Sequence, residues 1–106
     1  MSNGRDLKHI LERIYNHESL VGIDLRKLYL SFMNFTGLEL RRMDDCDLTD
    51  ANLANAKLSH ASLNRAKLTG AILTNVVADG ASFEGATGLT PPTIEYLKAK
   101  GANGLD

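Results

Sequence analysis

The sequence predicts a mainly β protein, a four-sided solenoid of about three coils with an α-helix at each end. Residues 46–85 fall into eight consecutive five-residue units without a gap. The first and third places of every unit are apolar, and the first place is always small. The flanking segments, residues 1–20 and 91–106, carry helix signals instead. We therefore expect a single domain, residues 1–106, with the solenoid at 21–90 between two helical caps.

The five-residue period fits neither a regular helix nor a flat strand. In a helix, five residues turn through about 500°, so successive leucines would scatter around the axis. In a flat strand, side chains alternate between faces, so every second leucine would face water. The period suits a chain that turns a corner after each unit, because four corners then close a coil of about 20 residues. Every first and third place is then expected to point at a common axis.

The units resemble pentapeptide repeats. The family motif is a small residue, then Asn or Asp, then Leu or Phe, then two variable residues. ANLAN and CDLTD match this motif, and AKLSH, AKLTG and ASLNR match it at all but the second place. The resemblance implies a right-handed quadrilateral parallel β-helix with the Leu and Phe column stacked inside.

An earlier block also repeats. Residues 23–42 read IDLRK, LYLSF, MNFTG and LELRR, with bulkier first places than the later units. The step from Leu40 to Leu48 is eight residues, which indicates a phase slip of three residues at Met43–Asp45. An alternative keeps one phase throughout and makes the bulky first places the central column, but the polar second places favour the slip. With the slip, we expect each residue of the first block to lie beneath the residue 23 positions later.

The N-terminal segment predicts a cover for one end of the solenoid, where leucines would otherwise meet water. Asn3 is a candidate helix cap, and apolar residues at helical spacing predict a helix over about residues 4–17. A membrane-surface helix is the alternative. It is disfavoured because the polar face mixes Lys8 and Glu12, whereas membrane-surface helices are cationic.

The C-terminal segment predicts a second cover. Thr90 followed by two prolines is typical of a helix start, and Gly101 of a helix stop. The tail also resembles the C-terminal caps of pentapeptide-repeat proteins, some of which form dimers at that end. The resemblance therefore implies Tyr96 and Leu105 as candidate oligomer contacts.

Composition excludes several function classes. The 12 Lys and Arg residues face 13 Asp and Glu residues, so there is no basic surface for nucleic acid or for an anionic membrane. No apolar run approaches the length of a transmembrane span, and the polar start predicts no signal peptide, so we expect a cytoplasmic protein. The single cysteine, Cys46, allows no internal disulfide and is expected to pack inward.

Catalytic and metal-binding arrangements are not evident. Ser59 and His60 are adjacent, but no carboxylate in their unit would orient the histidine. His9 and His17 are eight residues apart and do not form a metal pair. We expect no catalytic residue, no metal, no cofactor and no small-molecule substrate.

The outward-facing columns are expected to carry the function. In the predicted register, two aromatic side chains lie beneath two asparagines and then beneath an isoleucine and a third asparagine. Exposed apolar groups rimmed by polar ones are typical of contact sites. The candidate partner-binding residues are Tyr29, Phe32, Asn52, Asn55, Ile72 and Asn75. The alternative is that residues of the N-terminal cap cover the two aromatics.

Two charged groupings follow from the same register. Lys27 is expected beneath Asp50, as an exposed ion pair between coils. Arg42 is expected beneath Arg65 with Arg41 beside it, which would make a small basic spot.

The leading functional interpretation is a non-enzymatic protein–protein interaction or scaffold module whose partner is another protein or a second copy of the chain. The resemblance implies an alternative, a DNA-mimic inhibitor of a DNA topoisomerase such as gyrase. That role requires rows of carboxylates, and residues 46–85 carry almost balanced charges. A structural or decoration element of a phage or another assembly is a further alternative. We expect neither a nucleic-acid nor a membrane partner.

Overall fold

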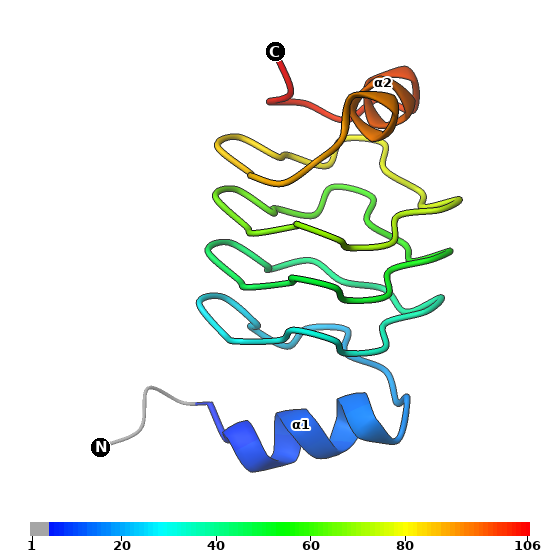
Figure 1. The fold of residues 1–106 in the computed structure, drawn as a ribbon. Helices are drawn as coiled ribbons and strands as arrows, with labels where there is room; N and C mark the ends of the chain where they lie inside the picture. Colours follow the sequence, from blue (N-terminus) through cyan, green and yellow to red (C-terminus); the bar gives the residue numbers. More distant parts are fainter. Residues whose placement is uncertain (1–4) are drawn as a thin grey trace.

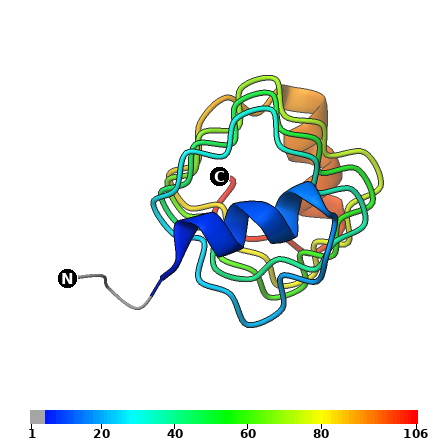
Figure 2. The same ribbon diagram turned by 90° about the horizontal axis from the view of Figure 1, so that it is seen from below.

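The computed structural model describes residues 5–106 and consists of a stack of coils with a helix at each end (Figure 1). Helix α1 (Leu7–Tyr15) crosses the N-terminal end of the stack, and helix α2 (Pro91–Ala99) lies at the C-terminal end. Seen along the stack, the coils superimpose in a four-cornered outline (Figure 2).

Neighbouring coils are joined by isolated parallel β-bridges. One wall runs from Asp24 through Arg42, Ser62 and Ser82 to Asn103. Each stretch of pairing is short because the chain turns a corner between one bridge and the next. The architecture is a β-helix of three complete coils and a partial fourth. The right-handed sense that the resemblance implies stays a prediction.

The third-place residues fill the interior. All of them from Leu25 to Phe83 are buried, and each buried Leu or Phe contributes about 1.5–3 kcal/mol of hydrophobic stabilisation. The small first places of the later coils, such as Ala51 and Ala61, are buried as well. The bulky first places of the first coil are only partly buried: Ile23, Leu28, Met33 and Leu38.

The phase slip is present, but it makes the first coil shorter. Residues that stack on one another there are 18 positions apart and not the predicted 23. Met43 is fully buried and occupies the central column itself, three residues after Leu40. Asp24 therefore pairs with Arg42, 18 residues later, and the coils that follow repeat every 20 residues. The predicted offset of 23 residues is wrong, because a side of three residues replaces a side of five. Every inference about which outward residues stack on the first coil changes accordingly.

The corners explain the sequence motif. Fifth-place residues adopt left-handed backbone, for example Asn55 at φ 60° and Gly70 at φ 73°. Second-place carboxamides and carboxylates brace these corners: Asn52 accepts from the N–H of Ala54 at 3.0 Å. Asn and Asp suit both places because they form such local hydrogen bonds and tolerate positive φ.

Helix α1 begins later than the sequence predicts. The side chain of Asp6 caps it by accepting from the N–H of His9 at 3.2 Å. Asn3, the predicted cap, lies outside the described residues. Ile10 and Ile14, one turn apart, are buried against the stack, so α1 covers the N-terminal end as expected.

Helix α2 follows the predicted signals. Thr90 occupies the N-cap position without a side-chain capping bond, and the two prolines occupy the first turn. Leu97 is fully buried, and the hydroxyl of Tyr96 donates to the carbonyl of Val76 at 3.2 Å, which fixes α2 on the last coil. Within residues 5–106, neither helix has the length and apolar character required to cross a membrane.

Candidate functional site

Exposed aromatic side chains gather in the N-terminal part of the molecule. Tyr15 at the end of α1 is 91% exposed, and Tyr29 and Phe32 in the first coil are 85% and 77% exposed. We call these three residues the N-terminal aromatic surface. The alternative that cap residues cover Tyr29 and Phe32 is wrong for the part of the chain that the structure describes. Exposure on this scale leaves the three rings available for a partner.

A groove connects two of these aromatics. It has a volume of about 490 Å³ and lies between the end of α1 and the first coil. Tyr15 and Phe32 line it together with Ile14, Met33 and other residues of the same corner. His17, Ser31 and Asn34 make part of the lining polar, and the apolar part can hold a side chain of aliphatic size.

Phe32 is unusual as the only Phe, Tyr or Trp at a positive-φ corner among residues 5–106, as well as in its exposure. It occupies a fifth-place corner with φ 63°, a region that bulky residues with a Cβ rarely adopt. The equivalent corners carry residues such as Asn55 or Gly37, which adopt this conformation at lower cost. Since the Phe32 ring is mostly in solvent, packing in the described structure does not repay the strain.

The predicted six-residue wall does not form as one surface. Tyr29 pairs with Asp47 instead of lying beneath Asn52, because the first coil has 18 residues. Asn52 lies on a different wall, between Asn34 and Ile72. The other predicted members separate as well: Phe32 donates its N–H to Thr49, whereas Asn55 donates to Thr74 at the next corner.

A second groove, at the C-terminal end, joins three of the predicted residues. Ile72 and Asn75 line it together with Tyr96, Pro92 and parts of the last coil, and its volume is about 420 Å³. The sequence placed Tyr96 in a separate oligomer contact, but the structure brings it beside this wall because α2 folds back over the last coil. Leu105, the other candidate oligomer contact, is half-buried beside the core.

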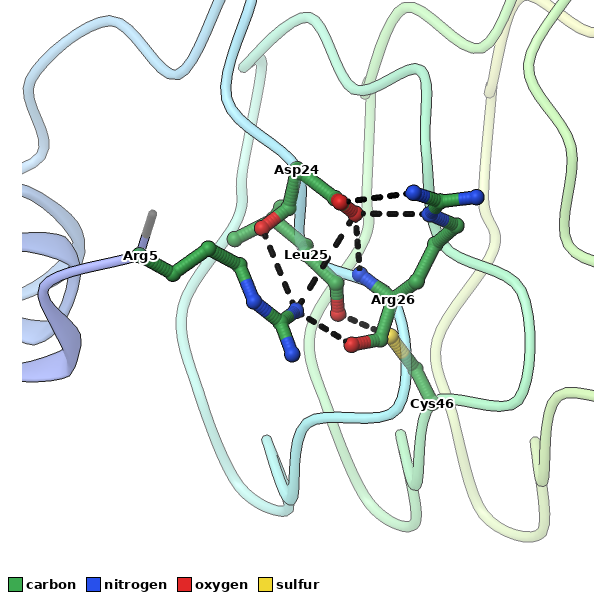
Figure 3. A network of polar contacts seen from close by, with 5 residues as sticks. All are labelled: Arg5, Asp24, Leu25, Arg26 and Cys46. Atoms are coloured by element: carbon green, nitrogen blue, oxygen red, sulfur yellow. Dashed lines mark hydrogen bonds and ion pairs between the residues drawn. The ribbon is translucent and has the colours of Figure 1, made fainter. Parts of the chain in front are cut away.

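A network of charged groups ties the segment before α1 to the first coil (Figure 3). Arg5 donates from Nη1 to the carbonyls of Asp24 and Arg26, and its Nη1 lies 4.0 Å from the Asp24 carboxylate. Arg26 binds the same carboxylate through two side-chain nitrogens, each at 2.8 Å. The hydrogen bonds from Arg26 hold the pKa of Asp24 well below its usual range. Because Arg5 immediately precedes the capped start of α1, this network helps to position the helix.

The predicted charge pairs are replaced by others. Arg65 pairs with Asp45 at 2.9 Å, and its hydrogen bond lowers the pKa of that carboxyl. Arg41 lies 3.5 Å from Glu39. The basic spot expected from Arg41, Arg42 and Arg65 is therefore wrong: two of its members have acidic partners, and Arg42 pairs with Ser62 on another wall. Lys27 joins the Asp45 and Arg65 cluster instead of meeting Asp50.

Cys46 is packed as predicted. Its Sγ donates to the carbonyl of Leu25 at 2.8 Å, and burial raises the pKa of the thiol to about 11. A thiol of this kind stays protonated at neutral pH and is a poor nucleophile.

A carboxylate lies beside Ser59 and His60, where the sequence predicted none. Asp79, one coil later, accepts from the hydroxyl of Ser59 at 2.6 Å and lies 3.9 Å from Nε2 of His60. The hydrogen bond from Ser59 lowers the pKa of Asp79. Nucleophilic catalysis places the histidine between serine and carboxylate. Here the carboxylate lies between the other two, so the serine does not donate to its base.

The family comparison agrees with the repeat seen in the later coils. Residues 46–86 match the family model for pentapeptide repeats, in eight copies. Among solved structures, the chain is similar to a pentapeptide repeat protein from the Arabidopsis thaliana thylakoid lumen. The two share 26% sequence identity over 74% of this chain and 81% of that chain, with a TM-score of 0.39. The comparison with curated proteins finds no match. The tandem copies, each with its third place buried in a coiled stack, identify residues 46–86 as pentapeptide repeats.

Proposed function

We propose that this chain is a non-enzymatic, cytoplasmic protein–protein interaction or scaffold module that contacts its partner through the N-terminal aromatic surface. The observation that carries the proposal is Phe32. Its backbone is strained at φ 63° and its ring is 77% exposed, so neither conformational preference nor packing explains an aromatic residue there. Backbone strain that no packing offsets is typical of residues that serve a function.

The other members of the surface support the same reading. Tyr15 and Tyr29 expose rings with few rotatable bonds, and such side chains recur at the centres of protein interfaces. The stacked coils hold them on a rigid support, which lowers the entropy lost on docking.

The DNA-mimic alternative receives no support from the charge columns. On the wall of Tyr29, Asp47 is followed by Lys67 in the next coil. At the neighbouring corner, Asp45 is neutralised by Arg65. A surface that imitates a nucleic-acid backbone needs unbroken rows of negative charge.

The test is affinity capture from the native host with three matched baits. These are the wild type, the double variant Tyr29→Ser/Phe32→Asn, and a control variant Ile72→Ser/Val77→Ser. The control removes two exposed apolar side chains from the later coils, at 46% and 47% exposure. We expect a protein that is retained by the wild type and by the control but at least ten-fold less by the aromatic variant. Equal retention by all three baits would refute the proposal.

A further inference from the structure

We infer that the chain self-associates through α1, which packs antiparallel against α1 of a second copy. This inference names the partner of the N-terminal contact surface and so rests on the proposed function. Three observations on α1 carry it: an uncovered apolar stripe, a self-complementary pair of charges beside the stripe, and a groove at the end of the helix.

The apolar face of α1 is wider than the stack covers. Ile10 and Ile14 are buried against the first coil. Leu7, Leu11 and Tyr15 follow one another at intervals of four residues, so they form a second stripe next to the buried one. This stripe is uncovered, with exposures of 51%, 40% and 91%. Helical stripes of this kind are stable in water when a second helix covers them.

The charges beside the stripe fit a second copy of the same helix. Lys8 and Glu12 lie one turn apart and line a shallow depression with Leu11 and Tyr15. In the described residues, neither side chain has an ion-pair partner. A two-fold axis near Leu11 reverses the direction of the partner helix, so Lys8 of each copy faces Glu12 of the other. A neutral, self-complementary edge suits this partner better than an anionic membrane, which requires a cationic face.

The ends of the two helices also match. The same axis places Leu7 of the second copy opposite Tyr15, beside the groove that Tyr15 and Phe32 line. This groove, of about 490 Å³, accommodates a leucine side chain. A helix of nine residues is only about 13.5 Å long, so the contact is smaller than a standard interface. We therefore expect a dissociation constant in the micromolar range, roughly 10–100 µM.

The experiment is sedimentation of the 106-residue chain across its expected dissociation range, with charge-reversal variants. Lys8→Glu gives a helix edge with two negative charges, and Glu12→Lys gives one with two positive charges. We expect the wild type to dimerise and each variant alone to dimerise at least ten-fold more weakly. An equimolar mixture of the two variants should recover the dimer, because opposite edges then meet. Recovery on mixing separates contact between copies from the Lys8–Glu12 attraction within one helix, which mixing does not restore.

Three results would overturn the inference. The first is a wild type that stays monomeric up to about 1 mM, a concentration well above the expected constant. The second is a dimer that both charge variants form unchanged, with no gain on mixing. The third is a monomer that binds vesicles of anionic phospholipid, which would assign the stripe to a membrane surface. None of these results removes capture of a different protein that depends on Tyr29 and Phe32, so failure of the dimer and failure of the proposed function are distinguishable.

Discussion

The first coil and the later coils share the same repeat but place different residues at its first places and corners. In the later coils the first places are small and buried, as at Ala51 and Ala61, and most corners carry Asn, Asp or Gly, which adopt positive φ readily. In the first coil the first places are bulky and partly buried, one corner carries Phe32, and a wall residue is the exposed Tyr29. The later coils are thus built for close stacking. The first coil packs against α1 on one side and against the second coil on the other.

This comparison shows where a repeat can vary. A coil inside the stack is packed on both sides, so a larger first place would clash with its neighbours. The first coil has a helix in place of a coil on one side and tolerates large residues there. Function is therefore expected at an end of a short stack, where sequence change costs least stability.

The largest expected difference between the two regions is between a fully buried leucine of the later coils and a partly buried one of the first coil. Leu63 is fully buried in the later coils. The change Leu63→Ala should lower the unfolding free energy of the protein by about 3 kcal/mol, because a cavity remains. Leu38→Ala in the first coil should lose about 1 kcal/mol, since Leu38 is only partly buried. Urea unfolding followed by circular dichroism measures both values. Equal losses would show that the first coil is packed as tightly as the others.

Enlarging a small first place should have the next largest effect. Ala61→Leu adds a side chain where neighbouring coils stack closely, and we expect a loss of about 2 kcal/mol from overpacking. The opposite change in the first coil, Leu28→Ala, should cost about 1 kcal/mol or less. Thermal unfolding of both variants provides the check. An Ala61→Leu protein as stable as the wild type would remove the distinction between the two kinds of first place.

The charged network at the first coil should contribute less and should depend on pH. The pKa of Asp24 is lowered in the folded protein, mainly by the hydrogen bonds from Arg26. The folded state therefore gains stability above the unfolded pKa of about 4 and loses it as the pH falls through the lower folded value. Asp24→Asn should cost about 1 kcal/mol at pH 7.

The same network predicts how this difference changes with acid. The gap in melting temperature between wild type and Asp24→Asn should shrink steadily as the pH falls below about 4. Asp79→Asn, at a more exposed carboxylate of the later coils, is the matched control and should change the melting temperature less. A gap for Asp24→Asn that is constant from pH 7 to pH 2 would assign the effect to packing and not to charge.

Much of the fold was predictable because its determinants are local. The five-residue period predicted the buried column, which runs from Leu25 to Phe83 with one three-residue step at Met43. Proline and threonine at the start of α2 predicted the residue at which it begins. The length of the first coil was not predictable in the same way. It depends on whether Met43 enters the central column or lies in a loop, and tertiary packing decides that.

The candidate site was predicted in part. Tyr29 and Phe32 were singled out correctly as outward residues, because their places in the unit are outward. The predicted neighbours of Tyr29 and Phe32 were wrong, because an error in the length of the first coil shifts all of its residues relative to the second coil. Arg5 was missed altogether, because its contacts join segments that are about 20 residues apart and no spacing rule links them. The stripe on α1 had a signal, the four-residue spacing of Leu7, Leu11 and Tyr15.

The most direct test of this account is the unfolding free energy of the double variant Tyr29→Ser/Phe32→Asn. The central claim is that these aromatics serve contact and not folding. Asparagine relieves the strain at the Phe32 corner, and neither ring is packed. We therefore predict a free energy equal to that of the wild type or higher by about 0.5 kcal/mol. A loss of more than about 1 kcal/mol would show that the rings hold the first coil together, and would contradict the claim.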